Sequence, residues 1–298
     1  MSRTRSSVAT RSDDVRRPPA PLSWDVFTSE PLQTLVDEPP PGWRHRVWPP
    51  ISSTLIYGVR EAVLVDAPIT VDQVRTLMDR IAASGKSLTT VYVTHGHGDH
   101  WFGAGALTDR FPGARIVAIP AVAEQMRQHA TDAELALWKA RFPGRMPDRI
   151  RMPEEIPDHV IELEGQQLTA IELGHTDTDD TTCLHVPSIG LVAAGDAIYN
   201  GIYLQLRESD ADSRNEWIAA ADTIESLHPS SVIAGHKSEG RSDGTEIIAE
   251  TRRYIRDFED VLANCTTARE VFDRMVARYP TWKYPGALWA SAAQLKDS

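Results

Sequence analysis

Short apolar runs alternate along the chain with longer stretches in which apolar residues recur every three or four positions. Runs rich in β-branched and aromatic residues predict strands, and the three-to-four spacing predicts amphipathic helices. Regular structure is therefore expected from about Ser53 onward. Strands are expected at 54–57, 62–66, 89–93, 115–119, 160–163, 168–173, 181–186, 190–194 and 231–234. Helices are expected at 71–81, 101–111, 121–142, 217–227, 247–262 and 268–278.

The remaining segments define the domain organisation. Residues 1–20 are rich in Arg, Ser and Pro without periodicity, which predicts a disordered basic tail. Residues 21–298 are expected to form one domain, which the Pro- and Trp-containing stretch 21–50 wraps as extended chain and short turns. Residues 143–157 are irregular and rich in Pro and Arg, so 121–157 is expected to form a helical lid insertion.

Composition and charge narrow the range of partners. The 298 residues contain 31 Lys and Arg against 42 Asp and Glu, a net charge of −11. Because nucleic acids and anionic membranes bind basic surfaces, neither is an expected ligand. The two cysteines are too few for a disulfide framework or a thiolate zinc site, which fits a reducing, cytoplasmic compartment. A small-molecule substrate is the expected partner, and a homodimer is compatible with the sequence.

Metal-capable side chains directly follow four of the expected strands. Residues 94–100 read Thr-His-Gly-His-Gly-Asp-His, with three imidazoles and one carboxylate, and a single His or Asp follows each of three later strands. Loops at strand ends are held by a stiff sheet and exposed at its edge, so these side chains are expected to converge. The candidate ligands are His95, His97, Asp99, His100, His175, Asp196 and His236.

The number and type of these ligands predict a dinuclear centre. Seven ligands exceed the need of one tetrahedral ion but suit two ions that share one carboxylate. Imidazole and carboxylate donors without thiolate suit Zn²⁺ and also Mn²⁺, Fe²⁺ or Co²⁺. Such a pair lowers the pKa of bound water to about 7, which favours hydrolysis. The other histidines stand alone and are interpreted as ordinary surface or core residues: His45, His129, His159, His185 and His228.

The motif His-x-His-x-Asp-His, with a later His, Asp and His in order, resembles the signature of the metallo-β-lactamase superfamily over about residues 50–240. The resemblance implies an α+β fold: an αβ/βα sandwich of two mixed β-sheets with outer helices and the site at one edge. It also implies two metal ions, with zinc as the first choice. One ion would be held by His95, His97 and His175. The second ion would be held by Asp99, His100 and His236, and Asp196 would bridge the two.

The residue at position 196 helps to choose between classes of substrate. Superfamily members that hydrolyse β-lactams usually have Cys or Ser there, and Asp196 is more similar to the lactonase, glyoxalase II and phosphodiesterase branches. Tyr199 is similar to a tyrosine of the acyl-homoserine lactonases that contacts the substrate carbonyl or the leaving oxygen; the alternative is a packing tyrosine. Asp99, in addition to its role as ligand, and Tyr199 are therefore the candidate catalytic residues.

The loop after the third ligand departs from the pattern of the lactonases. They have His-Thr-Pro-Gly, whereas this chain has His175-Thr176-Asp177-Thr178. Asp177, Asp179 and Asp180 are interpreted either as outer partners that orient imidazoles or as a solvated polar turn. The pocket wall is expected to be aromatic and aliphatic, with candidates Trp101, Phe102, Met126, Trp138, Tyr199, Ile202 and Tyr203.

The expected function is a dinuclear metal-dependent hydrolase that opens a small-molecule lactone or ester. Hydrolysis of a β-lactam, thioester or phosphodiester on the same site is the first alternative. A mononuclear iron dioxygenase is a second, although it would not need Asp99, His100 and His236. A non-catalytic scaffold is a third, which the complete ligand set disfavours.

Overall fold

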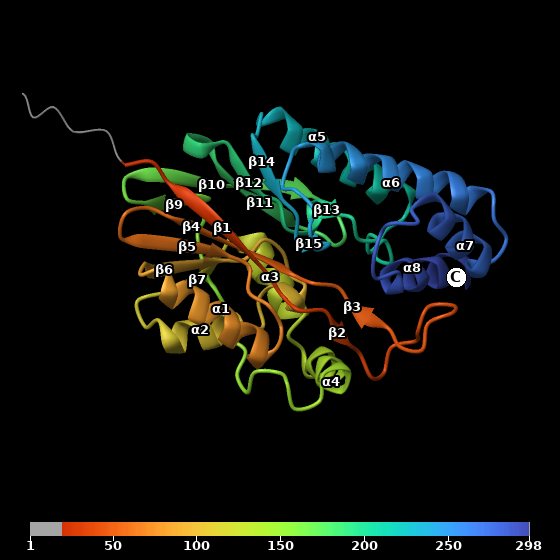
Figure 1. The fold of residues 1–298 in the computed structure, drawn as a ribbon, viewed down its shortest axis with the longest axis horizontal. Helices are drawn as coiled ribbons and strands as arrows, with labels where there is room; N and C mark the ends of the chain where they lie inside the picture. Colours follow the sequence, from red (N-terminus) through yellow and green to blue (C-terminus); the bar gives the residue numbers. More distant parts are fainter. Residues whose placement is uncertain (1–19, 298) are drawn as a thin grey trace, which may run out of the picture.

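Residues 20–297 of the computed structural model are described, and their two large β-sheets pack face to face with helices on both outer sides (Figure 1). The expected tail at 1–20 lies almost wholly outside the described residues. Helices α1 and α2 cover the first sheet, and α5 and α6 cover the second. This arrangement confirms the α+β sandwich that the resemblance implied.

The first sheet has six strands in the order β1-β4-β5-β6-β7-β8. The strands β1, β4 and β5 are antiparallel neighbours, and β5 to β8 run parallel, so the sheet is mixed. Parallel neighbours need a crossover, which α1 provides between β5 and β6 and α2 between β6 and β7. The bounds are β1 Ser23–Thr28, β4 Ser52–Tyr57, β5 Glu61–Val65, α1 Val71–Ala83, β6 Ser87–Tyr92, α2 Ala104–Arg110, β7 Arg115–Ala118 and β8 Glu154–Glu155.

The second sheet has five strands in the order β14-β12-β11-β10-β9. Its neighbours are antiparallel except β12 and β14, which α5 connects as a crossover. The bounds are β9 Val160–Leu163, β10 Gln166–Gly174, β11 Thr181–Val186, β12 Leu191–Ala193, α5 Ala211–Ser226, β14 Ser231–Ile233 and α6 Glu246–Ala263. Both expected hairpins, β4 with β5 and β11 with β12, are confirmed.

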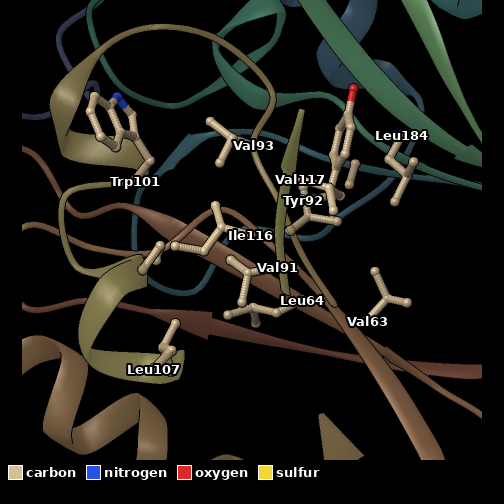
Figure 2. Packing of buried hydrophobic residues seen from close by; sticks show 14 of the residues in the cluster. Val63, Leu64, Val91, Tyr92, Val93, Trp101, Leu107, Ile116, Val117 and Leu184 are labelled. Carbon is tan, nitrogen blue, oxygen red and sulfur yellow. The ribbon is translucent and has the colours of Figure 1, made fainter. Parts of the chain in front are cut away.

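The alternation of side chains along β11 divides the core into two layers. Leu184 belongs to the cluster between the sheets, whereas its neighbour Cys183 packs in the cluster beneath α5 and α6. Tyr92 extends from the first sheet toward the strand that carries Leu184 (Figure 2), and its hydroxyl is hydrogen-bonded to Thr182 Oγ1 at 2.7 Å. The buried layer between the sheets thus fixes the edge at which the strand ends meet.

Regular structure begins earlier than Ser53, so that expectation is wrong. Strand β1 pairs along its whole length with β4, and β2 (Leu32–Gln33) pairs with β3 (Val47–Trp48). Strand β1 lies at the sheet edge, where polar residues interrupt its apolar pattern. One of them, Asp25, is partly exposed and forms an ion pair with Arg80.

Two helical regions also differ from expectation. The stretch 121–142 is divided into α3 (Pro120–Gln128) and α4 (Asp132–Arg141), because the Thr131 side chain caps α4 by accepting a hydrogen bond from Glu134 N. The C-terminal helices α7 (Ala268–Arg278) and α8 (Gly286–Asp297) pack with α6 in a third cluster. Helix α8 was not predicted, since its small Ala and Ser residues give no clear apolar stripe. Among residues 20–297, no helix combines the length and the apolar character that a membrane span requires.

Candidate metal centre

The loop at residues 94–100 follows β6 and is anchored by Asp66 at the end of the neighbouring strand β5. The Asp66 carboxylate accepts hydrogen bonds from Thr94 N (2.9 Å) and Thr94 Oγ1 (2.8 Å). Its Oδ2 also lies 3.0 Å from Nδ1 of His100. Because β5 and β6 are parallel neighbours, their carboxyl ends meet at one edge, and the buried Asp66 holds the start and the end of the loop there.

The second sheet supplies the later ligands to the same edge. His175 follows β10, Asp196 lies in the short 3₁₀ turn after β12, and His236 begins β15 (His236–Lys237), which pairs with β13 (Tyr199–Asn200). The two loops touch directly, since Gly235 N donates to Gly195 O at 2.7 Å. A Cβ on Gly235 would lie 2.0 Å from Asp196 Oδ1, so only glycine permits this approach.

Four predicted ligands come together as expected for the second ion. His100 Nε2 lies 3.1 Å from Asp196 Oδ1, and His236 Nε2 lies 3.2 Å from Asp196 Oδ2. Asp99 Oδ2 lies 3.5 Å from His236 Nε2 and 3.8 Å from His100 Nε2. The ligand atoms of Asp99, His100 and His236 all lie within 4.8 Å of one another, close enough to share an ion.

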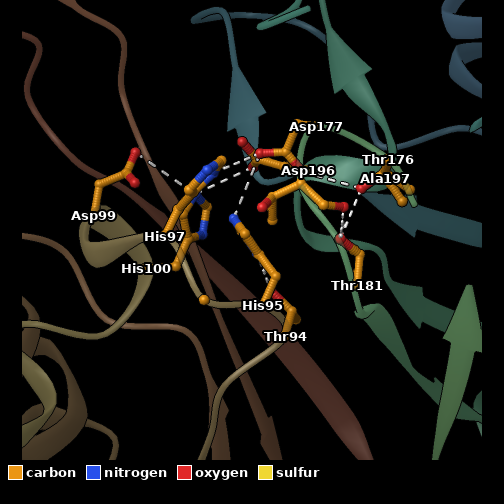
Figure 3. A network of polar contacts seen from close by, with 12 residues as sticks. Thr94, His95, His97, Asp99, His100, Thr176, Asp177, Thr181, Asp196 and Ala197 are labelled. Carbon is orange, nitrogen blue, oxygen red and sulfur yellow. Dashed lines mark hydrogen bonds and ion pairs between the residues drawn. The ribbon is translucent and has the colours of Figure 1, made fainter. Parts of the chain in front are cut away.

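At the position expected for the first metal ion, the neighbouring side chains differ from the predicted ligands. His95 and His97 lie together, and the third side chain beside them is Asp177. Figure 3 shows the His95 and His97 rings directed toward Asp177. Among the described residues, His175 belongs to no group of three whose ligand atoms all lie within 4.8 Å. Its buried Nε2 nevertheless lacks a hydrogen-bond partner, so its assignment to the first ion stays a prediction.

Each of these imidazoles is held at its other ring nitrogen, as is usual for metal-ligating histidines. For His100 the partner is Asp66, described above. The other pairs are His95 Nδ1 with Thr94 Oγ1 (2.9 Å), His97 Nε2 with Glu208 (3.4 Å), His175 Nδ1 with Asp179 Oδ1 (2.6 Å) and His236 Nδ1 with Pro50 O (2.8 Å). These contacts fix which nitrogen of each ring faces the centre. They also show that Asp179 orients an imidazole, which is one of the two interpretations given above for the acidic residues after His175.

The donor set fits divalent cations. Within residues 20–297, five buried side-chain atoms of the centre have no hydrogen-bond partner: His95 Nε2, His100 Nε2, His175 Nε2, Asp177 Oδ2 and Asp196 Oδ1. A buried polar atom without a partner costs about 1–3 kcal/mol, so several at one place call for a ligand. Imidazole nitrogens and carboxylate oxygens are donors for zinc and for other divalent first-row metals.

The charges of the centre support this conclusion. Burial opposes the charge on His236, but Asp196 and Asp99 outweigh burial and raise its pKa to about 10. Burial likewise opposes the charge on Asp196, whose pKa is nevertheless held well below its ordinary value by His236 and His100. Without metal, protons on these imidazoles balance the carboxylates. Divalent cations would replace the protons with the same sign of charge.

A pocket opens onto the centre and is partly lined by residues that the sequence did not single out. Trp48 Nε1 donates to Asp99 Oδ2 at 2.9 Å, and the His129 ring lies 5.2 Å from the His97 ring. His129 is therefore a wall residue at the centre, although it was interpreted as ordinary. Arg46, Arg141, Arg207 and Glu208 line the same pocket.

The predicted wall residues divide into two groups. Trp138, Tyr199 and Tyr203 line the pocket. The hydroxyl of Tyr199 donates to Asp196 Oδ2 at 2.7 Å, so this tyrosine is bonded to the centre. Trp101, Phe102, Met126 and Ile202 do not line it and are buried in the hydrophobic clusters. Helix α4 of the expected lid contributes Glu134, Trp138 and Arg141 to the wall, whereas β8, at the end of that region, joins the first sheet.

Comparisons with known proteins identify solved structures of similar fold. No curated protein matches the chain. Among solved structures, a metallo-beta-lactamase family protein from Thermus thermophilus has 18% identity and a TM-score of 0.60, with 90% of each chain covered. A metallo-beta-lactamase from Pontibacter korlensis has 15% identity and a TM-score of 0.55, covering 84% of this chain and 99% of that one. A Pseudomonas aeruginosa metallo-beta-lactamase in its mono-zinc form has 17% identity and a TM-score of 0.54, covering 81% and 97%.

The sequence itself matches the profile of one family, described as the metallo-beta-lactamase superfamily, over residues 46–236. This range is more than half of the chain and contains all seven predicted ligands. The chain therefore belongs to the metallo-beta-lactamase superfamily.

Proposed function

We propose that this protein is a dinuclear zinc hydrolase that opens an ester or lactone of a small molecule. The observation that carries the proposal is that Asp196 lies against the imidazoles of the second set with one buried carboxylate oxygen left unpaired among the described residues. Its Oδ1 has no hydrogen-bond partner, and the carboxylate lies 3.1–3.2 Å from the imidazoles of the second set. When bound, two zinc ions would supply a nucleophilic water near neutral pH and a Lewis acid for the substrate carbonyl.

The residues around the centre position the reacting groups. Asp66 and Trp48 hold His100 and Asp99, so the ligands of the second ion are oriented before metal binds. Tyr199 lines the pocket with its hydroxyl at Asp196. Burial, followed by the charge of Asp196, raises its pKa well above the usual value, so the hydroxyl keeps its proton. From this place it can donate to an oxygen of the substrate on which negative charge develops.

The pocket wall favours a substrate with an apolar body and an acidic group. Trp48 and Trp138 pack edge to face with ring centroids 5.0 Å apart, and the guanidinium of Arg46 lies 5.8 Å from the Trp48 ring centroid. Burial is the largest effect that lowers the pKa of Arg46, to about 10, and the group remains charged at neutral pH. Arg141 is already paired with Asp37, which leaves Arg46 as the stronger candidate for binding a carboxylate of the substrate.

Metal analysis and a substrate panel test the proposal. We expect two zinc ions per chain and hydrolysis of lactones or esters, ahead of thioesters, phosphodiesters and β-lactams. Asp196→Ala should abolish that hydrolysis and weaken metal binding, and full activity of this variant would refute the bridging role. One iron per chain with oxygen consumption would indicate a dioxygenase instead, and a wild-type protein without metal would remove the basis of the proposal.

A further inference from the structure

We propose that Asp177 is a ligand of the first metal ion, beside His95 and His97. This inference rests on the proposed function only in requiring that the centre binds metal. It adds an anionic donor to a position for which the sequence predicted only histidines and the shared Asp196.

The geometry of the carboxylate carries the inference. Asp177 is 1% exposed, and its Oδ2 lies 2.7 Å from His97 Nδ1 and 3.7 Å from His95 Nε2. These two nitrogens face the centre, because Glu208 and Thr94 contact the other nitrogen of each ring. In the part of the chain that the structure describes, Oδ2 has no hydrogen-bond partner despite this proximity. The oxygen and the two nitrogens are thus close together without hydrogen bonds between them. This is the arrangement expected of three ligand atoms that point toward one ion.

The loop directs only this acidic residue into the centre. The Thr176 hydroxyl donates to Asp177 Oδ1 at 3.0 Å, which leaves Oδ2 free to face the two imidazoles. Of its acidic neighbours, Asp179 contacts the far nitrogen of His175, and Asp180 accepts a hydrogen bond from Gln125 Nε2 at 3.0 Å. Figure 3 shows Asp177 on the opposite side of the centre from the His95 and His97 backbone.

An ordinary ion pair explains this arrangement less well. The Asp177 oxygen that faces His95 and His97 is buried and has no hydrogen-bond partner among residues 20–297, although it lies only 2.7 Å from His97 Nδ1. Such an oxygen is costly, and an ion held jointly by Asp177, His95 and His97 would remove the cost. A carboxylate oxygen is also a harder ligand, in the Lewis acid–base sense, than an imidazole nitrogen. The first position should therefore accept Mn²⁺ or Fe²⁺ more readily with Asp177 than with histidines alone.

Metal binding by Asp177→Asn tests the inference without reference to hydrolysis. Asp180→Asn is the matched control, since it removes a carboxylate of the same loop that faces outward. After loading and dialysis, the wild type and Asp180→Asn should each retain two zinc ions per chain. In Asp177→Asn, competition with a chromophoric chelator should show one site weakened by more than about 100-fold, because losing an outer partner alone costs about 10- to 100-fold. The visible spectrum of the cobalt-loaded variant should also change, because the bands of Co²⁺ report coordination number and donor type.

The outcomes separate this inference from the proposed function. If the wild type binds two zinc ions and Asp177→Asn has the same affinities and cobalt spectrum, Asp177 is no ligand and the hydrolase proposal stands. If the wild type binds no metal, both fail. Circular dichroism and melting of the metal-free proteins check folding. Should Asp177→Asn not fold, a crystal structure of the zinc-loaded wild type decides, because a carboxylate oxygen of Asp177 lies about 2.0–2.2 Å from zinc if Asp177 is a ligand and clearly farther if it is not.

Discussion

The hydroxyl of Tyr199 donates a hydrogen bond of 2.7 Å to Oδ2 of Asp196, the carboxylate that also lies against the imidazoles of His100 and His236. The side chain is buried, and its ring lies 5.4 Å from that of His236. Tyr199 therefore holds the Asp196 carboxylate in place and also lies on the wall of the pocket. These are two roles for one hydroxyl, and a single substitution separates them.

Tyr199→Phe removes the hydroxyl and keeps the ring. If the hydroxyl assists the reaction, kcat for lactones should fall by about 10²- to 10³-fold, the loss expected for one donor to a developing oxyanion. Simple aryl esters, whose leaving group needs less assistance, should be affected much less. Metal content, measured by elemental analysis, should stay unchanged. Equal rates for both proteins on both substrates would leave Tyr199 a packing residue.

Asp66 should be essential to the loop that carries the first four ligands. Asp66→Ala removes the acceptor for both Thr94 donors and the partner of His100, leaving buried donors unpaired at about 1–3 kcal/mol each. We expect a clear fall in melting temperature and loss of metal from the second position. Asp25→Ala is the control, because its exposed ion pair with Arg80 contributes at most about 1 kcal/mol. Equal melting temperatures of the two variants would contradict the anchoring role.

The residues that the sequence could identify are those whose signal is local. Imidazoles and a carboxylate crowded into residues 94–100 predict a metal loop wherever the loop lies, and short runs of β-branched and aromatic residues predicted most of the strands beneath it. His236 and Asp196 were identifiable because each follows a strand. The structure brings both to Asp99 and His100.

The residues that were missed depend on contacts between distant parts of the chain. Trp48 reaches Asp99 across 51 positions, and Glu208 reaches His97 across 111. Neither belongs to a local motif, since an isolated Trp or Glu has no pattern. Asp177 was noticed, but its alternatives could not be separated until the loop showed which of three neighbouring carboxylates faces the centre.

Cys183 should be chemically inert in the folded protein. It is fully buried beneath α5 and α6, and burial raises the pKa of its thiol to about 12. Because the thiolate forms only as the pH approaches that value, about one molecule in ten thousand carries it at pH 8. In the variant Cys265→Ser, a disulfide reagent at pH 8 should therefore react slowly without denaturant and stoichiometrically in urea. Rapid reaction of the native variant would mean that the outer helices do not cover the second sheet.

Arg46 should determine the preference for acidic substrates. Its guanidinium lies at the Trp48 face of the pocket, close enough to Arg141 and Arg207 for their charges to lower its pKa, although burial contributes most. Arg46→Ala should raise KM for a carboxylated substrate by about tenfold, the effect of losing one charge-assisted hydrogen bond of about 1.5 kcal/mol. The neutral methyl ester of that substrate should show little change, and kcat for both should be preserved because Arg46 contacts no predicted ligand. Steady-state kinetics with this matched pair of substrates, at low and high salt, provides the measurement. An equal rise in KM for the acid and its methyl ester would show that Arg46 shapes the pocket and does not bind an anion.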